Sequence, residues 1–464
     1  MKKYLALFLA LVMTLALVAC GGGNSSTGDA GSSGGSSSSS GGSATTTTTP
    51  AASDSNIKEA AADTPAITQG VTKNVFDGNT SGLNKDVKIG VILVGDENEG
   101  YTYAHIAGVR EAMSALGLTD SNIVWYYNIP ENEQCYDKCI EAVEAGCSLV
   151  ITNSYSHQTY AQQAASEHPE VEFVAMTGDQ AAASGLANFH NAFTMVYESR
   201  FASGVVAGMK LKELMDAGKV TDPYIGYVGA YPYAEVVSGF TGFFLGIKSI
   251  VPEAHMDVMY TNSWFDLQAE AQTAEALMSR GCVIIGQHAD STGAPSAVQA
   301  AKDGGKTVYS VGYNIDMLSA APTAALTSAT NDWGVYYTYA FSQLMKGESI
   351  ATNWTGGYAQ GAVTTTPLGP EVAAGTEAAL SDLAAKLDSG FQVFDVSTFT
   401  APKCTNGSYA TDDAGHLTVA CTVDTDGDWV ADTGNAVFDG YYHESFGQSA
   451  PSFSIIIDGI TTLN

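Results

Sequence analysis

The sequence is poor in basic residues. Lysine and arginine together number 19, against 49 aspartates and glutamates, and the formal net charge is −30 at pH 7. A chain this acidic lacks the attraction that holds proteins on nucleic acid or on anionic membrane surfaces. We therefore expect no nucleic-acid partner, and we interpret the charge as a means of keeping an exposed protein soluble.

Common catalytic motifs are also missing. After residue 84 the sequence has no G-x-S-x-G, no H-E-x-x-H and no G-x-x-x-x-G-K-[ST]. His157 and His288 can be combined with nearby carboxylates into an acid/base pair, but among eight histidines such a pair carries little weight. The cysteines and histidines do not have zinc-site spacing. The sequence thus favours a protein that is not an enzyme and has no cofactor.

The one long apolar run lies at the N-terminus and is too short to span a bilayer comfortably. Lys2 and Lys3 precede apolar residues 4–18, and Leu17-Val18-Ala19-Cys20 resembles the bacterial lipobox. In such signals the chain is cleaved before the cysteine, which is then acylated. We expect residues 1–20 to be a lipoprotein signal peptide and Cys20 to be the lipid anchor. The alternative is an ordinary secretory signal with a chance cysteine.

A low-complexity stretch follows the signal. From residue 21 to about residue 49 the chain is nearly all Gly, Ser, Thr and Ala, and a mixed composition continues to about Asn84. Such a stretch buries too little apolar surface to offset its ordering entropy. We predict that residues 21–84 form a disordered linker. It would hold a body at the extracytoplasmic face of the cell membrane, in a Gram-positive type bacterium.

The next 285 residues or so alternate between short β-branched runs and helical apolar spacing, which predicts parallel sheets covered by helices on both faces. The pattern restarts near residue 199 and predicts two similar α/β lobes in residues 85–369. We expect an N-lobe of about 85–198 plus 314–345, and a C-lobe of about 199–313 plus 346–369. Each is a doubly wound parallel sheet, and a hinge joins the two. Residues 370–464 form a C-terminal α+β extension, with a helix at 373–387 and a strand at 391–399.

Ligands of open α/β sheets bind beyond the carboxyl ends of the strands. The turns after the expected strands are rich in aromatic, Asp, Asn and His side chains, which suit a small ligand with a flat ring and several hydroxyls or amides. For each residue a role in a turn or cap remains an alternative. The candidate ligand-binding residues are Asn98, Tyr101, Tyr155, Glu235, Trp264, Asp266, His288, Asp290, Asp316, Asn331 and Trp333.

The remaining cysteines are expected in an oxidising compartment. Cys404 and Cys421 stand alone in the extension and are candidates for a local disulfide. Cys135 lies on an expected helix and Cys147 opens the next strand, so they could form a helix-to-strand disulfide. Buried free thiols are the alternative for this second pair.

An acidic loop in the extension repeats the alternating carboxylates of a Ca²⁺ loop. Its candidate ligands are Asp424, Asp426, Asp428 and Asp432. Against a calcium site, Trp429 stands where an EF-hand has glycine. An acidic turn between hairpin strands is therefore the favoured interpretation.

Several segments, taken in order, resemble the basic membrane protein family, also called the purine nucleoside receptor A-like family. The segments are 88–92 (KIGVI), 98–101 (NEGY), 200–208 (RFASGVVAG), 235–240 (EVVSGF), 263–266 (SWFD), 281–284 (GCVI), 311–316 (VGYNID) and 327–331 (TSATN). The resemblance implies a type I periplasmic-binding-protein fold and a lipid-anchored substrate-binding protein of an ABC importer.

The resemblance also implies roles for individual residues. A nucleoside base would lie between aromatic rings, with Tyr101 where the family has a stacking Phe and Asn98 near a polar contact to the base. Asp316 matches the family's ribose-binding Asp, and Asn331 replaces its usual Lys.

The function that we expect is capture of a nucleoside-like, purine-type solute by a monomeric lipoprotein that serves an ABC permease. The alternatives are a sensory or adhesin-like lipoprotein of the same fold and, less favoured, a surface hydrolase.

Overall fold

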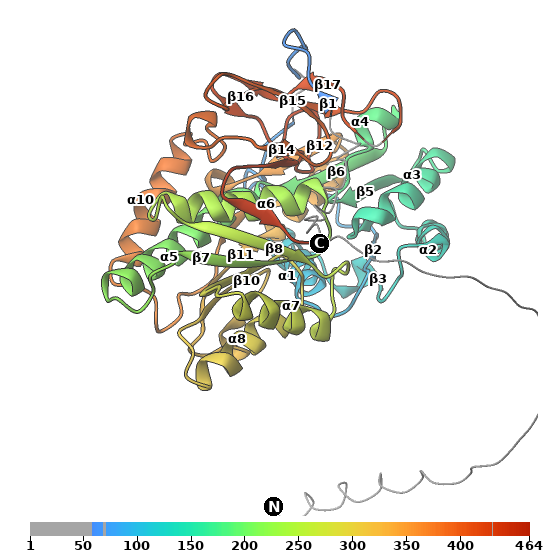
Figure 1. The fold of residues 1–464 in the computed structure, drawn as a ribbon. Coiled ribbons are helices and arrows are strands. Elements are labelled where there is room, and N and C mark those ends of the chain that lie inside the picture. Colours follow the sequence, from blue (N-terminus) through green and yellow to red (C-terminus); the bar gives the residue numbers. More distant parts are fainter. Residues whose placement is uncertain (1–57, 68–70, 429) are drawn as a thin grey trace, which may run out of the picture. The chain divides into compact units, whose positions relative to one another are not determined.

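A computed structural model describes residues 58–67, 71–428 and 430–464. Cys20 and the predicted signal peptide lie outside these residues. The described chain forms two α/β lobes and an added C-terminal region (Figure 1). None of its helices has the length and apolar character needed to cross a membrane.

The N-lobe is built on a six-stranded parallel sheet with the order β12-β6-β5-β4-β2-β3. Its middle strands are buried on both faces because helices cover both sides. The strands are β2 (Ile89–Ile92), β3 (Ile123–Tyr126), β4 (Leu149–Thr152), β5 (Glu172–Met176), β6 (Phe189–Thr194) and β12 (Asn353–Gly356). The helices are α1 (Gly100–Leu116), α2 (Glu133–Glu144), α3 (Gln158–Glu167), α4 (Ala181–Ser184) and α9 (Trp333–Lys346).

The C-lobe has a seven-stranded sheet with the order β13-β11-β10-β9-β7-β8-β21. All neighbours are parallel except β13, which runs antiparallel to β11. The strands are β7 (Tyr224–Gly229), β8 (His255–Tyr260), β9 (Ile284–Gln287), β10 (Tyr309–Tyr313), β11 (Ala325–Asn331), β13 (Val363–Thr365) and β21 (Ile460–Thr462). The helices are α5 (Val196–Asp216), α6 (Ala234–Lys248), α7 (Leu267–Ser279) and α8 (Gly293–Asp303).

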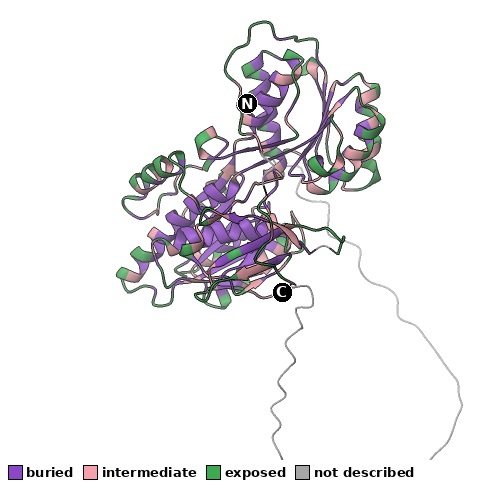
Figure 2. Cartoon of the chain, turned by 90° about the horizontal axis from the view of Figure 1, so that it is seen from above, coloured by how far each residue is buried: buried purple, intermediate pink, exposed green. Residues whose placement is uncertain are grey.

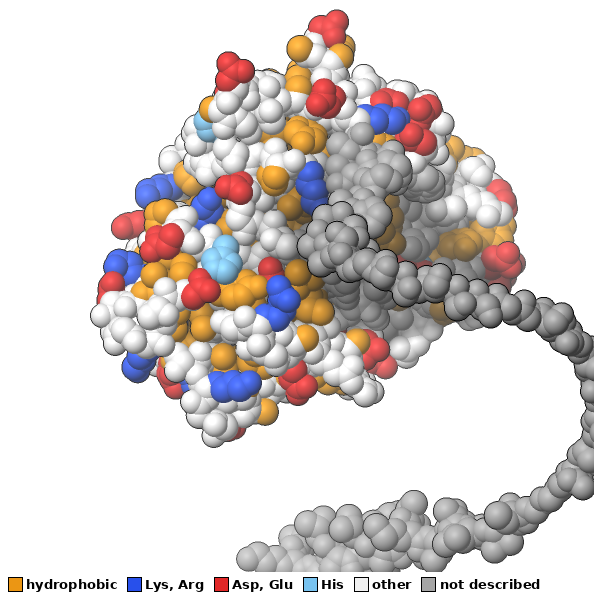
Figure 3. Space-filling model, in the orientation of Figure 1, with side chains coloured by type: hydrophobic (Ala, Val, Ile, Leu, Met, Phe, Trp, Pro, Cys, Tyr) orange, Lys and Arg blue, Asp and Glu red, His pale blue; other side chains and the backbone are white. Residues whose placement is uncertain are grey.

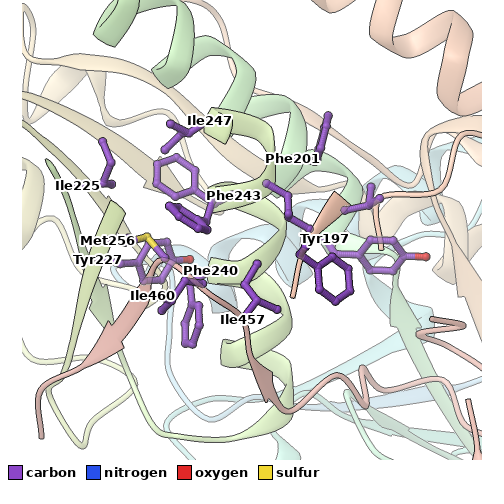
Figure 4. Packing of buried hydrophobic residues seen from close by; sticks show 14 of the residues in the cluster. Tyr197, Phe201, Ile225, Tyr227, Phe240, Phe243, Ile247, Met256, Ile457 and Ile460 are labelled. Carbon is purple, nitrogen blue, oxygen red and sulfur yellow. The ribbon is translucent and has the colours of Figure 1, made fainter. Parts of the chain in front are cut away.

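Helices α5 and α6 form the centre of the C-lobe core, and Figure 2 shows them among the most buried elements. Small residues allow the close approach: a Cβ added to Gly204 would lie 2.1 Å from the Phe243 carbonyl oxygen. Figure 4 shows Phe240 and Phe243 of α6 beside Ile457 and Ile460 from the end of the chain. The C-terminal region thus completes this core.

The C-terminal region begins with α10 (Thr376–Asp388), which packs on α5. Its main sheet has the order β1-β15-β16-β17 and includes a strand from the start of the described chain. Its strands are β1 (Lys58–Glu59), β14 (Lys403–Cys404), β15 (Ser408–Thr411), β16 (Leu417–Val423), β17 (Thr433–Asn435), β18 (Val437–Phe438), β19 (Tyr441–Tyr442) and β20 (Ile455–Ile456). The short 3-10 helices of the whole chain are η1 (Asp120–Asn122), η2 (Tyr155–His157), η3 (Met317–Ser319), η4 (Tyr358–Gln360) and η5 (Val396–Thr398).

The predicted α/β class with two parallel-sheet lobes is confirmed, but several boundaries differ. The expected linker boundary near Asn84 is wrong, because β1 pairs with β15 and Trp354 Nε1 donates to the Asn74 carbonyl oxygen at 2.7 Å. These contacts place segments 58–67 and 71–84 in the folded body.

The assignment of segments to the lobes also changes after residue 314. Strand β11 belongs to the C-lobe sheet because it pairs with β10, and β12 belongs to the N-lobe sheet because it pairs with β6. The strand expected at 391–399 is absent among these described residues. Asp395 instead caps η5 by accepting a hydrogen bond from the Ser397 amide.

The visible surface does not carry a single band of charge. Figure 3 shows acidic, basic and apolar side chains interspersed over the described residues of this face. The large net negative charge of the chain is therefore dispersed rather than concentrated on this face.

Candidate functional site

An aromatic wall of the N-lobe lies at the start of α1 and α9. His105 stacks on Trp333 with ring centroids 4.5 Å apart, and Tyr101 meets the edge of His105 at the same distance. Burial lowers the pKa of His105 to about 3, so its ring is neutral. The Tyr101 hydroxyl donates to the Asn153 carbonyl oxygen, beyond β4. This wall therefore offers flat, uncharged surfaces.

A charged wall of the C-lobe faces the same region. The buried guanidinium of Arg200 lies 3.7 Å from the centre of the Tyr313 ring, and Nη1 donates to the Gln287 carbonyl oxygen at 2.6 Å. His288 Nε2 and Glu235 Oε1 are 2.6 Å apart. The charged wall therefore combines a cation, a carboxylate and an imidazole at the carboxyl ends of β9 and β10.

Arg200 is incompletely paired. Its Nε and Nη2 atoms are buried and make no hydrogen bond within the described chain. Unpaired buried donors are costly, at about 1–3 kcal/mol each and more on a charged group. Arg200 can therefore donate further hydrogen bonds to an acceptor on a bound ligand.

A buried amide network joins the two walls. Asn314 Nδ2 donates to Asp290 Oδ1 at 2.7 Å, and Asn331 Nδ2 donates to Asn314 Oδ1 at 3.2 Å. From the N-lobe, the Thr194 hydroxyl donates to Asn331 Oδ1 at 2.5 Å. Asn314 has a positive φ of 61°, a conformation that asparagine tolerates better than most residues and that comes directly after β10. The network thus links side chains of β6 and β11 with Asp290 and Asn314, which follow β9 and β10.

The lobes are in contact at this site. A Cβ on Gly100, the first residue of α1, would lie 3.3 Å from the Asp290 carbonyl oxygen. Burial raises the pKa of Asp290 well above its usual value, and the charges of Glu99, Glu270 and Glu235 add to the shift while Arg200 opposes it. Burial also raises the pKa of Tyr101. Carboxylates from both lobes therefore repel one another when the lobes meet.

Aromatic residues from both lobes continue along the edge of the site. Tyr155 donates to Asp179 Oδ2 at 2.9 Å, and its ring lies 6.2 Å from that of Tyr233 in the C-lobe. Tyr231 stacks on Tyr233 and meets Trp264 edge-on, with centroids 5.1 Å apart in both pairs. These rings extend the aromatic surface away from the amide network.

The predicted site residues fall into two groups. The structure brings together Tyr101, Glu235, His288, Asp290, Asn331 and Trp333, with Tyr155 and Trp264 nearby. The remaining three candidates, Asn98, Asp266 and Asp316, do not lie with this group. Asp266 and Asp316 are exposed caps that accept amides of α7 and η3, and exposed Asn98 donates from its side chain to Asp96.

The predictions missed residues that complete the site: Arg200, Tyr313 and Asn314. Arg200 lies on α5, and nothing in its local pattern shows that its side chain reaches the ends of β9 and β10. Asn314 was more accessible to prediction, because a polar residue directly after an apolar strand is the usual position for a ligand contact.

Both predicted disulfides are wrong. All six cysteines of the described chain are buried free thiols. Cys404 Sγ lies 3.8 Å from the Ser454 hydroxyl, whereas Cys421 Sγ lies 3.8 Å from the Thr64 hydroxyl, so the two thiols face different partners. Cys135 Sγ lies 4.0 Å from the His157 carbonyl oxygen, and burial raises the pKa of Cys147 to about 11.

The acidic loop brings together three of its four carboxylates. One ligand oxygen from each of Asp424, Asp426 and Asp432 lies within 4.8 Å of the others. Asp428 instead pairs with Lys58 at 2.9 Å. Calcium binding stays the less favoured alternative to an acidic turn, with Asp424, Asp426 and Asp432 as the candidate ligands that lie together.

Comparison with known proteins identifies the family. Residues 87–377 match the family described as ABC transporter substrate-binding protein PnrA-like. A purine-binding protein of Brucella abortus is 31% identical over 291 residues, which are 62% of this chain and 78% of that protein. A putative ABC transporter glucose-binding protein of Haloferax volcanii is 30% identical over 48% of this chain and 53% of its own length.

Solved structures show the same fold. A solute-binding protein of an ABC transporter system from Conexibacter woesei superposes with a TM-score of 0.53 at 21% identity, over 66% of this chain and 97% of its own. One from Aeropyrum pernix has a TM-score of 0.55 at 14% identity, over 71% and 95%. The expected periplasmic-binding fold is thus confirmed.

Proposed function

The chain belongs to the PnrA-like family of ABC transporter substrate-binding proteins, and from this membership we propose that it captures a nucleoside-like solute between its lobes for a membrane permease. The family consists of substrate-binding proteins rather than enzymes. The purine-binding relative favours a purine nucleoside or base as the solute.

The observation that carries the proposal is that an aromatic wall faces a charged wall. The charged wall includes Arg200, which has donors that no protein acceptor uses. Tyr101 and Trp333 provide ring surface for a flat base. Arg200 has two unpaired N–H positions for ring nitrogens or hydroxyl oxygens. Asp290 and Glu235 can accept hydrogen bonds from amino or hydroxyl groups. A nucleoside supplies all three kinds of partner, and an aliphatic solute does not supply the first.

Lobe contact supports a capture mechanism. Meeting of the lobes brings the charge of Glu99 close to buried Asp290, so ionisation of Asp290 disfavours the closed arrangement of the protein alone. A solute that donates hydrogen bonds to these groups offsets the repulsion only when the lobes are together. It therefore shifts the population toward closure through contacts that exist in that state alone.

Delivery would rest on the predicted anchor. Acylation at Cys20 would tether the protein to the extracytoplasmic face of the cell membrane, and a flexible linker would keep it near its permease. Tethering raises the effective concentration of the loaded protein at a fixed partner. A single folded body suffices for this role, so we propose a monomer.

Native mass spectrometry of the full chain, followed by thermal unfolding with a nucleoside panel and glucose, tests the proposal. Adenosine, guanosine or inosine at about 100 times its Kd should stabilise the protein by about 2.7 kcal/mol. Tyr101→Ala should abolish this stabilisation, whereas Tyr103→Ala, on the exposed side of the same helix, should leave it intact. Stabilisation by glucose alone would contradict a nucleoside ligand. Release of free base from a bound nucleoside would indicate a hydrolase.

A further inference from the structure

A pocket of about 280 Å³ lies where the chain crosses between the lobes. Two of its walls are formed where the chain passes from one lobe to the other. Met195 and Glu198 lie where β6 of the N-lobe leads into α5 of the C-lobe. Ala359 and Gln360 lie between β12 of the N-lobe and β13 of the C-lobe. The C-terminal region supplies a third wall, from residues 390–392 and 441–446. We call this space the hinge pocket.

Two carboxyl groups of the hinge pocket are buried. Glu198 is 8% exposed and its Oε2 accepts a hydrogen bond from the Tyr358 amide at 2.7 Å. Glu444 is 2% exposed and its Oε2 accepts from the amides of Ser452 and Phe453. Burial raises the pKa of each carboxyl to about 7.

One carboxyl oxygen of the hinge pocket is not matched by a protein donor. Glu444 Oε1 makes no hydrogen bond of normal geometry to the described residues, although the Ser238 hydroxyl is near enough to lower the pKa of Glu444. Holding a carboxyl group away from water without full pairing costs stability, so the pocket has capacity for a donor from outside.

Aromatic rings complete the pocket. Tyr197, Phe391, Tyr441 and Phe446 line it, and Phe391 is 39% exposed. Burial lowers the pKa of His443, so this ring is neutral near pH 7. Carboxylates combined with several ring faces form the kind of site that recognises ammonium groups, because a cation is attracted by both.

We propose that the hinge pocket is a second binding site, which takes a small organic ammonium ion and is coupled to the movement of the lobes. A divalent metal ion fits this pocket less well, because two carboxyl groups fall short of the roughly six oxygen ligands that such an ion takes. Lys73 also lines the pocket, and its charge partly opposes the burial that raises the pKa of Glu198. The two carboxyl groups outnumber this single lysine, so they disfavour an anion. The pocket is near the lower end of the size range of small-molecule sites, which suits a compact amine.

The position of the pocket provides the coupling. Glu198 in one crossing holds the Tyr358 amide in the other, so the carboxylate ties the two crossings together. The C-terminal region touches both lobes: the Ser449 hydroxyl donates to the Gly178 carbonyl oxygen, and Ala450 packs with Phe193 and Tyr313. Rotation of the lobes must change the relative positions of these groups. An ion that fits one arrangement better will therefore alter affinity at the interlobe site, and the effect is reciprocal.

Titration calorimetry of the full chain with choline tests the proposal directly. Its uncharged isostere, 3,3-dimethylbutan-1-ol, is the matched control, and sodium chloride keeps the ionic strength constant. Choline should bind at least about tenfold more tightly than the alcohol, because only the cation gains from rings and carboxylates. Equal affinity for both, or no heat from choline at millimolar concentrations, would overturn the proposal.

Variants locate the binding. Glu198→Gln should weaken choline binding by about tenfold while retaining an acceptor for the Tyr358 amide. Phe391→Ala, at the exposed ring, provides a second test that does not alter a buried carboxyl. Glu348→Gln changes an exposed carboxylate outside the pocket lining and should have no effect. If Glu198→Gln and Phe391→Ala both bind choline like the unaltered protein, the ion binds elsewhere and the assignment is wrong.

Discussion

The two walls of the interlobe site are built from different chemistry. The N-lobe wall is aromatic: His105 is a neutral ring held between Tyr101 and Trp333. The C-lobe wall carries Arg200, Glu235, His288 and Asp290 close together. The difference indicates a division of roles, in which one lobe supplies shape and ring surface and the other supplies hydrogen bonds and charge.

If the aromatic wall is also part of the N-lobe core, truncating it should have the largest effect on stability. Trp333 is 1% exposed and packs in the core beside Tyr336 and Tyr337. Trp333→Ala should lower the free energy of unfolding by about 3–5 kcal/mol. Trp264→Ala, at a half-buried ring, should cost about 1 kcal/mol. Urea denaturation compares them, and equal losses would mean that Trp333 is not a core residue.

The charged wall should make stability depend on pH. Burial raises the pKa of Glu270, which lies behind Asp290, to about 7. Its protonated form is favoured in the folded state, so the folded protein binds more protons than the unfolded chain between about pH 4.5 and pH 7. Stability should therefore fall as pH rises through this window, by up to about 3 kcal/mol from this group.

Glu270→Gln should flatten that dependence, since glutamine mimics the protonated carboxyl and can still accept from the Ser291 amide. Glu275→Gln, at an exposed position of the same helix, is the matched control. Urea denaturation at pH 5 and pH 7.5 measures both variants. An unchanged slope in Glu270→Gln would show that other groups dominate the titration.

The affinity for the solute tests the charged wall. Asp290→Ala removes an acceptor and leaves the Asn314 amide without its partner. We expect affinity for the bound nucleoside to fall by about thirtyfold, which corresponds to about 2 kcal/mol. Calorimetry with the best nucleoside of the panel measures this. An affinity within twofold of the unaltered protein would remove Asp290 from the site.

The smallest effect is expected at Asp316, which the family resemblance assigned to ribose. Its exposed side chain accepts the Leu318 amide. Asp316→Ala should leave nucleoside affinity within about twofold and cost about 1 kcal/mol of stability as a lost cap. A large loss of affinity would show that Asp316 moves into the site in another arrangement of the lobes.

Much of the fold was predictable because strand and helix periods are local. The alternation of β-branched runs with helical apolar spacing predicted two α/β lobes, and both occur. The segment around β11 and β12 was harder to assign to a lobe. Each strand is short and pairs with a strand distant in sequence, β10 in one lobe and β6 in the other, so local pattern could not assign either to its sheet.

The candidate site was predictable in part for the same reason. His288 and Asp290 follow β9 directly, so the rule for strand ends found them. Arg200 lies on a helix, and only packing brings its guanidinium onto Tyr313. Asp316 follows a strand end too, but its side chain turns back to cap η3. Proximity to a strand end therefore selects candidates without deciding where their side chains point.

By itself, the sequence determined the α/β class, the division into two lobes and an extension, and the family, because these follow from local periodicity and from the order of short motifs. Only the tertiary structure decided which side chains meet between the lobes, which cysteines face other partners, and that the start and end of the described chain complete the folded body. Those outcomes depend on contacts between residues far apart in sequence. The local sequence around either partner does not reveal such contacts.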